Sequence, residues 1–284
     1  MPARHPAAPS SDPAGPAASA ASSTPDPFPG LVARLRAAGC VFAEDEAQLL
    51  LATARTPAEL AAMAGRRAAG LPLEHVLGWA GFCGHRMRVG PGVFVPRRRS
   101  EFLVHQAARR TRPGAVVVDL CCGSGALGAA LAACAGPIEL HAADIDPAAV
   151  RCARANVAAA GGHVHEGDLF AALPRELCGR IDVLLANVPY VPTQEVGLLP
   201  PEARDHEPRV ALDGGADGLD VLRRVAEAAP RWLAPGGVLL SETSRRQAPA
   251  ALRALTGHGL RARTEHCAER AATVVLGTRP AGGA

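Results

Sequence analysis

A buried-strand pattern ends at a group of residues suited to holding a flat nitrogen. Residues 181–187 read IDVLLAN and continue as Val188-Pro189-Tyr190, where Tyr190 is the only tyrosine of the chain. Asn187 offers a side-chain carbonyl, and Val188 offers a backbone carbonyl that Pro189 helps to fix, because a residue before proline avoids helical geometry. Two acceptors beside a ring can hold both hydrogens of a planar –NH2 group. These four residues are therefore candidate catalytic residues, although an isolated Asn-x-Pro-Tyr also occurs in turns.

A glycine-containing loop provides the second candidate site. Residues 116–128 read VVVDLCCGSGALG, and Gly123, Gly125 and Gly128 match G-x-G-x-x-G, which alone is a weak signal that also fits a dinucleotide. Glycines let the backbone approach a ligand closely. Asp119 ends the strand, where its carboxylate would repel a pyrophosphate and attract a cationic amino acid group such as that of S-adenosylmethionine. The alternative for Asp119 is a cap or turn residue.

Two more acidic residues follow predicted strands. Asp144 comes about twenty residues after the glycine loop, where a carboxylate accepts both hydroxyls of a ribose, in NAD or in S-adenosylmethionine. Asp146 precedes a proline and is typical of a helix N-cap. Asp168 could accept from an adenine amine, with Leu169 or Phe170 against the ring, but a turn aspartate is equally compatible.

Strands and helices alternate from residue 112 onward, which predicts a mostly parallel sheet covered by helices on both faces. The last two strands are close enough in sequence to form an antiparallel hairpin at the edge. We expect strands at 115–120, 138–144, 163–168, 181–187, 236–242, 260–266 and 272–278, and helices at 126–136, 147–162, 218–233 and 247–259.

The part before this sheet divides into three. Residues 1–30 are rich in Pro, Ala and Ser and predict a disordered tail. Residues 31–78 have helical periodicity, with Thr56 as a candidate N-cap before a proline, and predict a small helical module. Residues 79–98 contain short β-rich runs separated by Gly-Pro-Gly and predict a hairpin linker. We expect residues 99–280 to form the domain that contains the sheet.

Composition limits the class of protein. Hydrophobic residues make up 48% of the 284 residues, aromatic residues only 3%, and the net charge of +3 does not demand a nucleic-acid partner. No apolar run has the length of a membrane span, and no secretory signal opens the chain. The eight cysteines form no CxxC pair, and His163 and His165 lack zinc spacing. We therefore expect a cytoplasmic protein without a metal.

Together, the glycine loop, the three aspartates and the Asn187–Tyr190 group resemble the amino-methylating class I methyltransferases. Within these, the chain resembles the HemK/PrmC family of protein glutamine methyltransferases, on a divergent branch. The resemblance covers residues 31–278 and includes the segments 66–97 and 207–224, which read RRAAGLPLEHVLGWAGFCGHRMRVGPGVFVPR and EPRVALDGGADGLDVLRR.

The resemblance implies a Rossmann-like class I methyltransferase fold with S-adenosylmethionine as the cofactor. It makes residues 31–78 a small helical N-terminal domain for substrate recognition and residues 99–280 the S-adenosylmethionine-dependent methyltransferase domain. It implies methylation of a glutamine side-chain amide in a peptide-chain release factor or a related translation protein, with nucleic acid involved only indirectly and no membrane. The implied cofactor-binding residues are Asp119, Cys121, Gly123, Gly125, Asp144, Asp168, Leu169 and Asn187.

The chain departs from the family pattern at three places. Val188 replaces the first proline of Asn-Pro-Pro-Tyr, and Cys121 replaces the first glycine of Asp-Leu-Gly-x-Gly. The segment PRRRSE keeps Pro96, Arg97 and Glu101 of Pro-Arg-Pro-x-Thr-Glu, while Arg98 and Arg99 do not match. Three alternatives stay open: an adenine-amine methyltransferase acting on DNA or RNA, an NAD-binding oxidoreductase, and an inactive binding module.

Overall fold

The computed structural model describes residues 27–281, and its centre is a seven-stranded sheet. The strand order is β5-β4-β3-β6-β7-β9-β8, in which the first five strands run parallel and β9 is antiparallel to both β7 and β8. The predicted parallel sheet with a terminal hairpin is confirmed. The strands are β3 (Val116–Leu120), β4 (Glu139–Asp144), β5 (His163–Glu166), β6 (Ile181–Ala186), β7 (Leu233–Thr243), β8 (Arg261–Cys267) and β9 (Ala272–Thr278).

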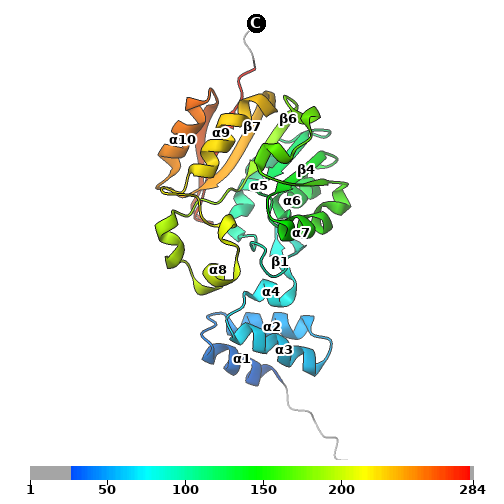
Figure 1. Ribbon diagram of the computed structural model, residues 1–284. Helices are drawn as coiled ribbons and strands as arrows, with labels where there is room; N and C mark the ends of the chain where they lie inside the picture. The colour runs from blue at the N-terminus through cyan, green and yellow to red at the C-terminus, as the bar shows by residue number, and fades with distance from the viewer. Residues whose placement is uncertain (1–26, 282–284) are drawn as a thin grey trace, which may run out of the picture.

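Helices cover both faces of this sheet (Figure 1). One face carries α5, α6 and α7, and the other carries α9 and α10, each over its own apolar core. Strand residues alternate between the two cores, as the period of two along a strand requires. The helices are α5 (Glu101–Ala108), α6 (Ala126–Ala135), α7 (Pro147–Val157), α9 (Asp220–Trp232) and α10 (Ala248–Gly257).

Four helices form a separate N-terminal module with its own core. Thr56 is the N-cap of α3, because its hydroxyl accepts a hydrogen bond from the Glu59 amide at 3.1 Å, as the sequence predicts. Residues 1–26 of the expected tail lie outside the described residues, whereas residues 27–30 of that range already belong to α1. The helices are α1 (Pro27–Ala37), α2 (Ala43–Thr53), α3 (Pro57–Ala68) and α4 (Leu73–Leu77).

A two-stranded hairpin follows, formed by β1 (Trp79–Phe82) and β2 (His85–Arg88). Its turn is Cys83-Gly84, with both residues at positive φ, and not the Gly-Pro-Gly at residues 90–92 that the sequence favours. Two adjacent residues in the left-handed region match the right-handed twist of a hairpin. Gly-Pro-Gly instead begins the extended segment that leads toward the sheet domain.

The connection after β6 carries α8 (Pro201–His206) between two 3₁₀ turns. In Figure 1 this yellow-green segment lies on the side of the sheet domain that faces the N-terminal module. Glu202 of α8 reaches Arg67 of α3 at 2.7 Å, so the segment contacts both parts of the molecule. No helix within residues 27–281 has the length and apolar character needed to cross a membrane.

Candidate active site

A pocket of about 400 Å³ opens at the carboxyl ends of the parallel strands. This is the edge where open α/β sheets bind ligands, and the volume lies within the range for small-molecule sites. Its inner wall is formed by the residues that directly follow β3, β4, β5 and β6, and its outer wall by the segment 93–99 and the α8 connection. The pocket therefore joins all the loops that carry the predicted site residues.

The loop after β3 forms the floor of the pocket. Cys121 lies in this wall with a φ of 53°, so the backbone keeps the left-handed conformation that glycine adopts easily even though the residue is not glycine. Gly123 also lies in the wall and donates its amide to Asp144 Oδ2 at 2.8 Å. Gly125 lies behind the wall, where a Cβ would come within 3.0 Å of Ala153 in α7.

Asp119 takes a different position from the one that its charge suggests. It is fully buried under the loop and is not part of the pocket wall. Its Oδ2 accepts from the Gly128 amide at 2.9 Å, whereas Oδ1 has no hydrogen-bond partner. Burial, with a smaller contribution from Asp144, raises the pKa of Asp119 to about 8. The strand-end position that suggested a ligand contact instead lets the carboxyl group hold the first turn of α6.

The two other aspartates both reach the pocket. Asp144 accepts from the Gly123 amide through Oδ2 and from the Asp146 amide through Oδ1, and burial raises its pKa. Asp146 is the N-cap of α7, as predicted. Asp168 forms an ion pair with Arg224 at 2.6 Å, and Leu169 beside it adopts a φ of 48° in the wall. One carboxylate is thus fixed on the loop, and the other is held at the pocket rim.

Asn187 and Val188 line the pocket directly after β6. The Asn187 amide nitrogen faces the hydroxyl of the buried Ser100 at 3.5 Å, which turns its Oδ1 the other way. That Oδ1 is buried and has no hydrogen-bond partner. A buried carbonyl oxygen without a donor costs free energy, so a ligand that supplies an N–H group would satisfy it.

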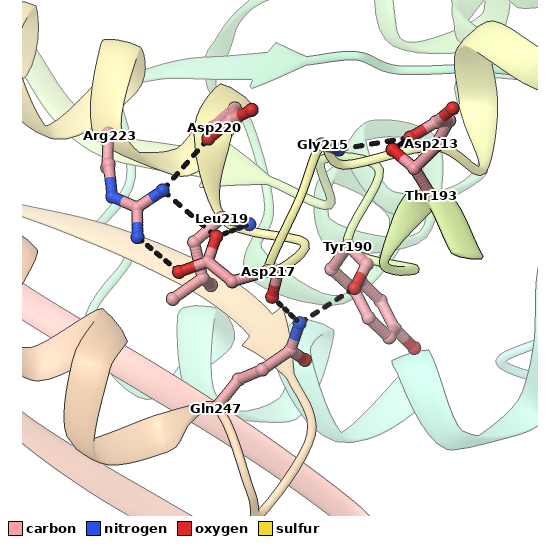
Figure 2. Close-up of polar contacts among 9 residues, drawn as sticks. All are labelled: Tyr190, Thr193, Asp213, Gly215, Asp217, Leu219, Asp220, Arg223 and Gln247. Carbon is pink, nitrogen blue, oxygen red and sulfur yellow. Dashed lines mark hydrogen bonds and ion pairs between the residues drawn. The ribbon is translucent and has the colours of Figure 1, made fainter. Parts of the chain in front are cut away.

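Tyr190 is held at both ends. Its hydroxyl donates to Glu242 Oε1 at 2.8 Å and accepts from Arg99 Nη2 at 2.6 Å. Its backbone carbonyl accepts from Gln247 Nε2 at 2.8 Å, and the same amide group donates to the Asp217 carbonyl (Figure 2). Burial, together with the charge of Glu242, raises the pKa of the Tyr190 phenol. The Tyr190 hydroxyl therefore stays protonated, and the ring has a fixed orientation.

Four residues of this site have no obvious signature in the sequence. Ser100 and Arg99 belong to the PRRRSE segment, whose sequence does not show what either side chain contacts. Glu242 follows an apolar run inside β7 and lies near the carboxyl end of that strand, and this position is the signal that could have found it. Gln247 begins a helix far from the loop that it supports, so only the folded chain reveals its role.

The fold and the site define a class I methyltransferase: a seven-stranded sheet of this order, with a pocket at its carboxyl edge and an Asn-x-Pro-Tyr group in the wall. Residues 86–198 match the family described as "Methyltransferase small domain". The chain is similar to a solved methyltransferase from Pyrococcus furiosus, with a TM-score of 0.53 at 16% identity over 69% of this chain and 90% of that chain. This likeness shows the fold.

Relatives in sequence define the family more narrowly. The chain is 40% identical to the release factor glutamine methyltransferase of Geobacter sulfurreducens over 74% of this chain and 73% of that protein. It is 41% identical to the release factor glutamine methyltransferase of Streptomyces coelicolor over 62% of this chain and 64% of that protein. The chain therefore belongs to the release factor glutamine methyltransferase family.

One relative has a different name. The 4-amino-L-phenylalanine/4-methylamino-L-phenylalanine methyltransferase of Streptomyces pristinaespiralis is 38% identical over 62% of this chain and 62% of that protein. Its named substrate carries an amino group on a flat ring, whereas the release factor enzymes act on a flat amide. Because the chain belongs to a methyltransferase family, the NAD-binding oxidoreductase, one of the alternatives drawn from the sequence, is excluded.

Proposed function

We propose that this protein transfers a methyl group from S-adenosylmethionine to the side-chain amide nitrogen of a glutamine in a peptide-chain release factor. Asn187 belongs to the pocket wall, and the observation that carries the proposal is that its buried Oδ1 has no hydrogen-bond donor. A glutamine amide supplies the N–H group that this oxygen lacks. The family and its 40% identical members support the same substrate.

The pocket residues fit the cofactor through the chemistry of their side chains. Asp144 suits a pair of ribose hydroxyls, and Asp168 with Leu169 suits an adenine amine and ring. Asp119 supports the loop from behind rather than contacting the ligand directly. The cofactor supplies an electrophilic methyl group on a sulfonium, and no metal ligand set exists among residues 27–281.

The residues after β6 prepare the nucleophile. An amide nitrogen is a weak nucleophile because its lone pair is delocalised into the carbonyl. Hydrogen bonds from its two N–H groups to Asn187 Oδ1 and the Val188 carbonyl return electron density to the nitrogen and fix its position. The Tyr190 ring stacks on the amide plane. Positioning and fixed dipoles of this kind supply much of a rate enhancement.

The substrate sets the partner and the compartment. A release factor acts in translation, so we place the reaction in the cytoplasm, with nucleic acid involved only through that partner. The N-terminal module of α1–α4 and the α8 connection border the mouth of the pocket, because Pro72, Glu74 and Glu202 belong to its wall. These elements provide the surface that grips a protein substrate.

An Asn187→Ala variant tests this proposal. Purified enzyme is incubated with labelled S-adenosylmethionine and candidate release factors, and the modified residue is mapped by mass spectrometry. We expect the wild type to methylate one glutamine, and Asn187→Ala to lose about 10²–10³-fold in kcat/KM, as when one fixed polar group of a reaction centre is removed. Binding of S-adenosylmethionine, measured by calorimetry, should change much less.

The control is Arg263→Ala, which removes an exposed charge on β8 away from the pocket and should behave as wild type. Free 4-aminophenylalanine and adenine-containing oligonucleotides are included as competing acceptors. Label on either of them, and none on a release factor glutamine, would contradict the proposal.

A further inference from the structure

The hydroxyl of Tyr190 belongs to a closed three-residue network. It donates to Glu242 Oε1 at 2.8 Å and accepts from Arg99 Nη2 at 2.6 Å, while Arg99 Nε donates to the same Glu242 oxygen at 2.8 Å. A phenol has one donor and accepts along defined directions. Because both functions are used, the network fixes the tip of the ring, just as Gln247 fixes its backbone end.

Glu242 can serve in this network only with a cationic neighbour. Its side chain is 3% exposed, and its Oε2 has no hydrogen-bond partner. A buried carboxylate without compensation is strongly unfavourable. The guanidinium of Arg99, about half exposed at the pocket rim, supplies the opposite charge at 2.8 Å.

Arg99 belongs to a short segment that contacts several parts of the site. In this 3₁₀ turn (Arg98–Ser100), Ser100 faces the Asn187 amide, and Arg97 just before it forms an ion pair with Glu207 of the α8 connection at 2.6 Å. Arg98 points elsewhere: it is exposed and is not part of the pocket wall. Two adjacent arginines of the same segment therefore have different surroundings.

We propose that Arg99 and Glu242 are positioning residues for Tyr190, which hold the ring in the orientation that stacks on the target amide. The inference deepens the proposed function and rests on it for the identity of the stacked group. The geometry of the network itself does not depend on the substrate. Arg98, next to Arg99, has no such role and offers a matched control.

The single tyrosine makes the ring directly observable. In protein labelled with 3-fluorotyrosine, the ¹⁹F resonance comes from Tyr190 alone. We expect Arg99→Gln and Glu242→Gln to shift this resonance, and Arg98→Gln to leave it at the wild-type position. Alkaline titration should show a lower pKa of the Tyr190 phenol in Glu242→Gln, since the carboxylate charge that raises it is gone, and a higher pKa in Arg99→Gln.

Activity then tests whether the two residues act through the phenol. Arg99→Gln and Glu242→Gln should each lower kcat about tenfold through misplacement of the ring, while the Kd for S-adenosylmethionine changes less than about twofold. In a Tyr190→Phe background, which keeps the ring and removes the hydroxyl, the same substitutions should have no further effect. If Arg99→Gln or Glu242→Gln lowers kcat further in the Tyr190→Phe background, that residue acts other than through the Tyr190 hydroxyl, and the proposal is overturned.

The two proposals can fail separately. If no release factor glutamine is methylated, the proposed function is wrong, but the ¹⁹F and titration results still report on the network. If Arg99→Gln leaves the resonance and the phenol titration as Arg98→Gln does, the positioning proposal is wrong even when glutamine methylation is observed.

Discussion

The carboxyl group of Asp119 is completely buried between β3 and α6. Burial raises its pKa from 3.8 to about 8, so the folded protein holds a proton there that the unfolded chain has already released at neutral pH. Below pH 4 both states are protonated and the group has no effect on stability. Between pH 4 and pH 8 the folded state binds more protons, so the contribution of Asp119 becomes steadily more unfavourable as pH rises.

An Asp119→Asn variant should remove this dependence. The amide oxygen can still accept from the Gly128 amide, and no proton is bound or released. We expect the free energy of unfolding of the variant, relative to wild type, to increase from pH 5 to pH 8 by about 1–4 kcal/mol, since one pKa unit corresponds to about 1.4 kcal/mol. Urea unfolding of both proteins at each pH measures this difference in the free energy of unfolding. A difference that stays constant with pH would show that Asp119 is ionised in the folded protein.

At the scale of elements, the loop that enters α9 supports Tyr190 from behind. Figure 2 shows Gln247 joining the Tyr190 carbonyl to the Asp217 carbonyl, while Arg223 holds the Asp217 carboxylate. Gly218 lies so close to these groups that an added Cβ would come within 2.3 Å of both the Tyr190 carbonyl oxygen and Gln247 Nε2. The position of Tyr190 therefore depends on a loop about thirty residues away in the sequence.

Gly218→Ala should damage activity through this contact. Gly236→Ala is the matched control, because both glycines have φ near +80° and only Gly218 has atoms within 4 Å of the new Cβ. Each substitution costs about 1–2 kcal/mol of stability for the left-handed backbone. We expect kcat/KM to fall at least about tenfold in Gly218→Ala alone, measured under conditions where both variants are folded. Equal activities would contradict a role for this loop in placing Tyr190.

At the scale of the whole molecule, Arg67 takes part both in a buried ion pair inside the N-terminal module and in a contact with the rest of the chain. Arg67 donates to both oxygens of Glu46, at 2.6 Å and 3.0 Å, and both side chains are about nine-tenths buried. Arg67 also contacts Glu202 of α8, whose side chain is about half exposed. The inner partner thus stabilises the module, and the outer partner joins it to the connection that borders the pocket.

Arg67→Met should destabilise the protein strongly, since it leaves the Glu46 carboxylate buried without compensation. Loss of one partner of a buried pair costs about 3–5 kcal/mol, whereas Glu202→Gln at the exposed partner should cost less than about 1 kcal/mol. Urea unfolding measures both variants. The double variant Arg67→Met with Glu46→Leu should recover most of the loss, and a double variant as unstable as the single one would contradict the ion-pair explanation.

Much of the fold was predictable because its signals are local. Apolar runs of strand length, Thr56 and Asp146 at helix starts and the alternation of elements depend on neighbouring residues, and each appears in the structure where the sequence places it. The predicted position of the hairpin turn was wrong because Cys83-Gly84 is a less obvious turn signal than Gly-Pro-Gly. Strand-end residues such as Asp144 and Asn187 were predictable as a group, since parallel strands bring their carboxyl ends to one edge.

The sequence by itself determined the class of fold, the edge of the sheet that carries the pocket and the residue types that line it. Hydrophobic periodicity, helix caps and strand ends each depend only on a short stretch of sequence. Only the tertiary structure decided that Asp119 lies behind the loop and that Arg99, Glu242 and Gln247 hold Tyr190. These contacts join residues 52 to 143 positions apart. The sequence shows which residues are charged, but only packing decides how deeply each is buried and which group it contacts.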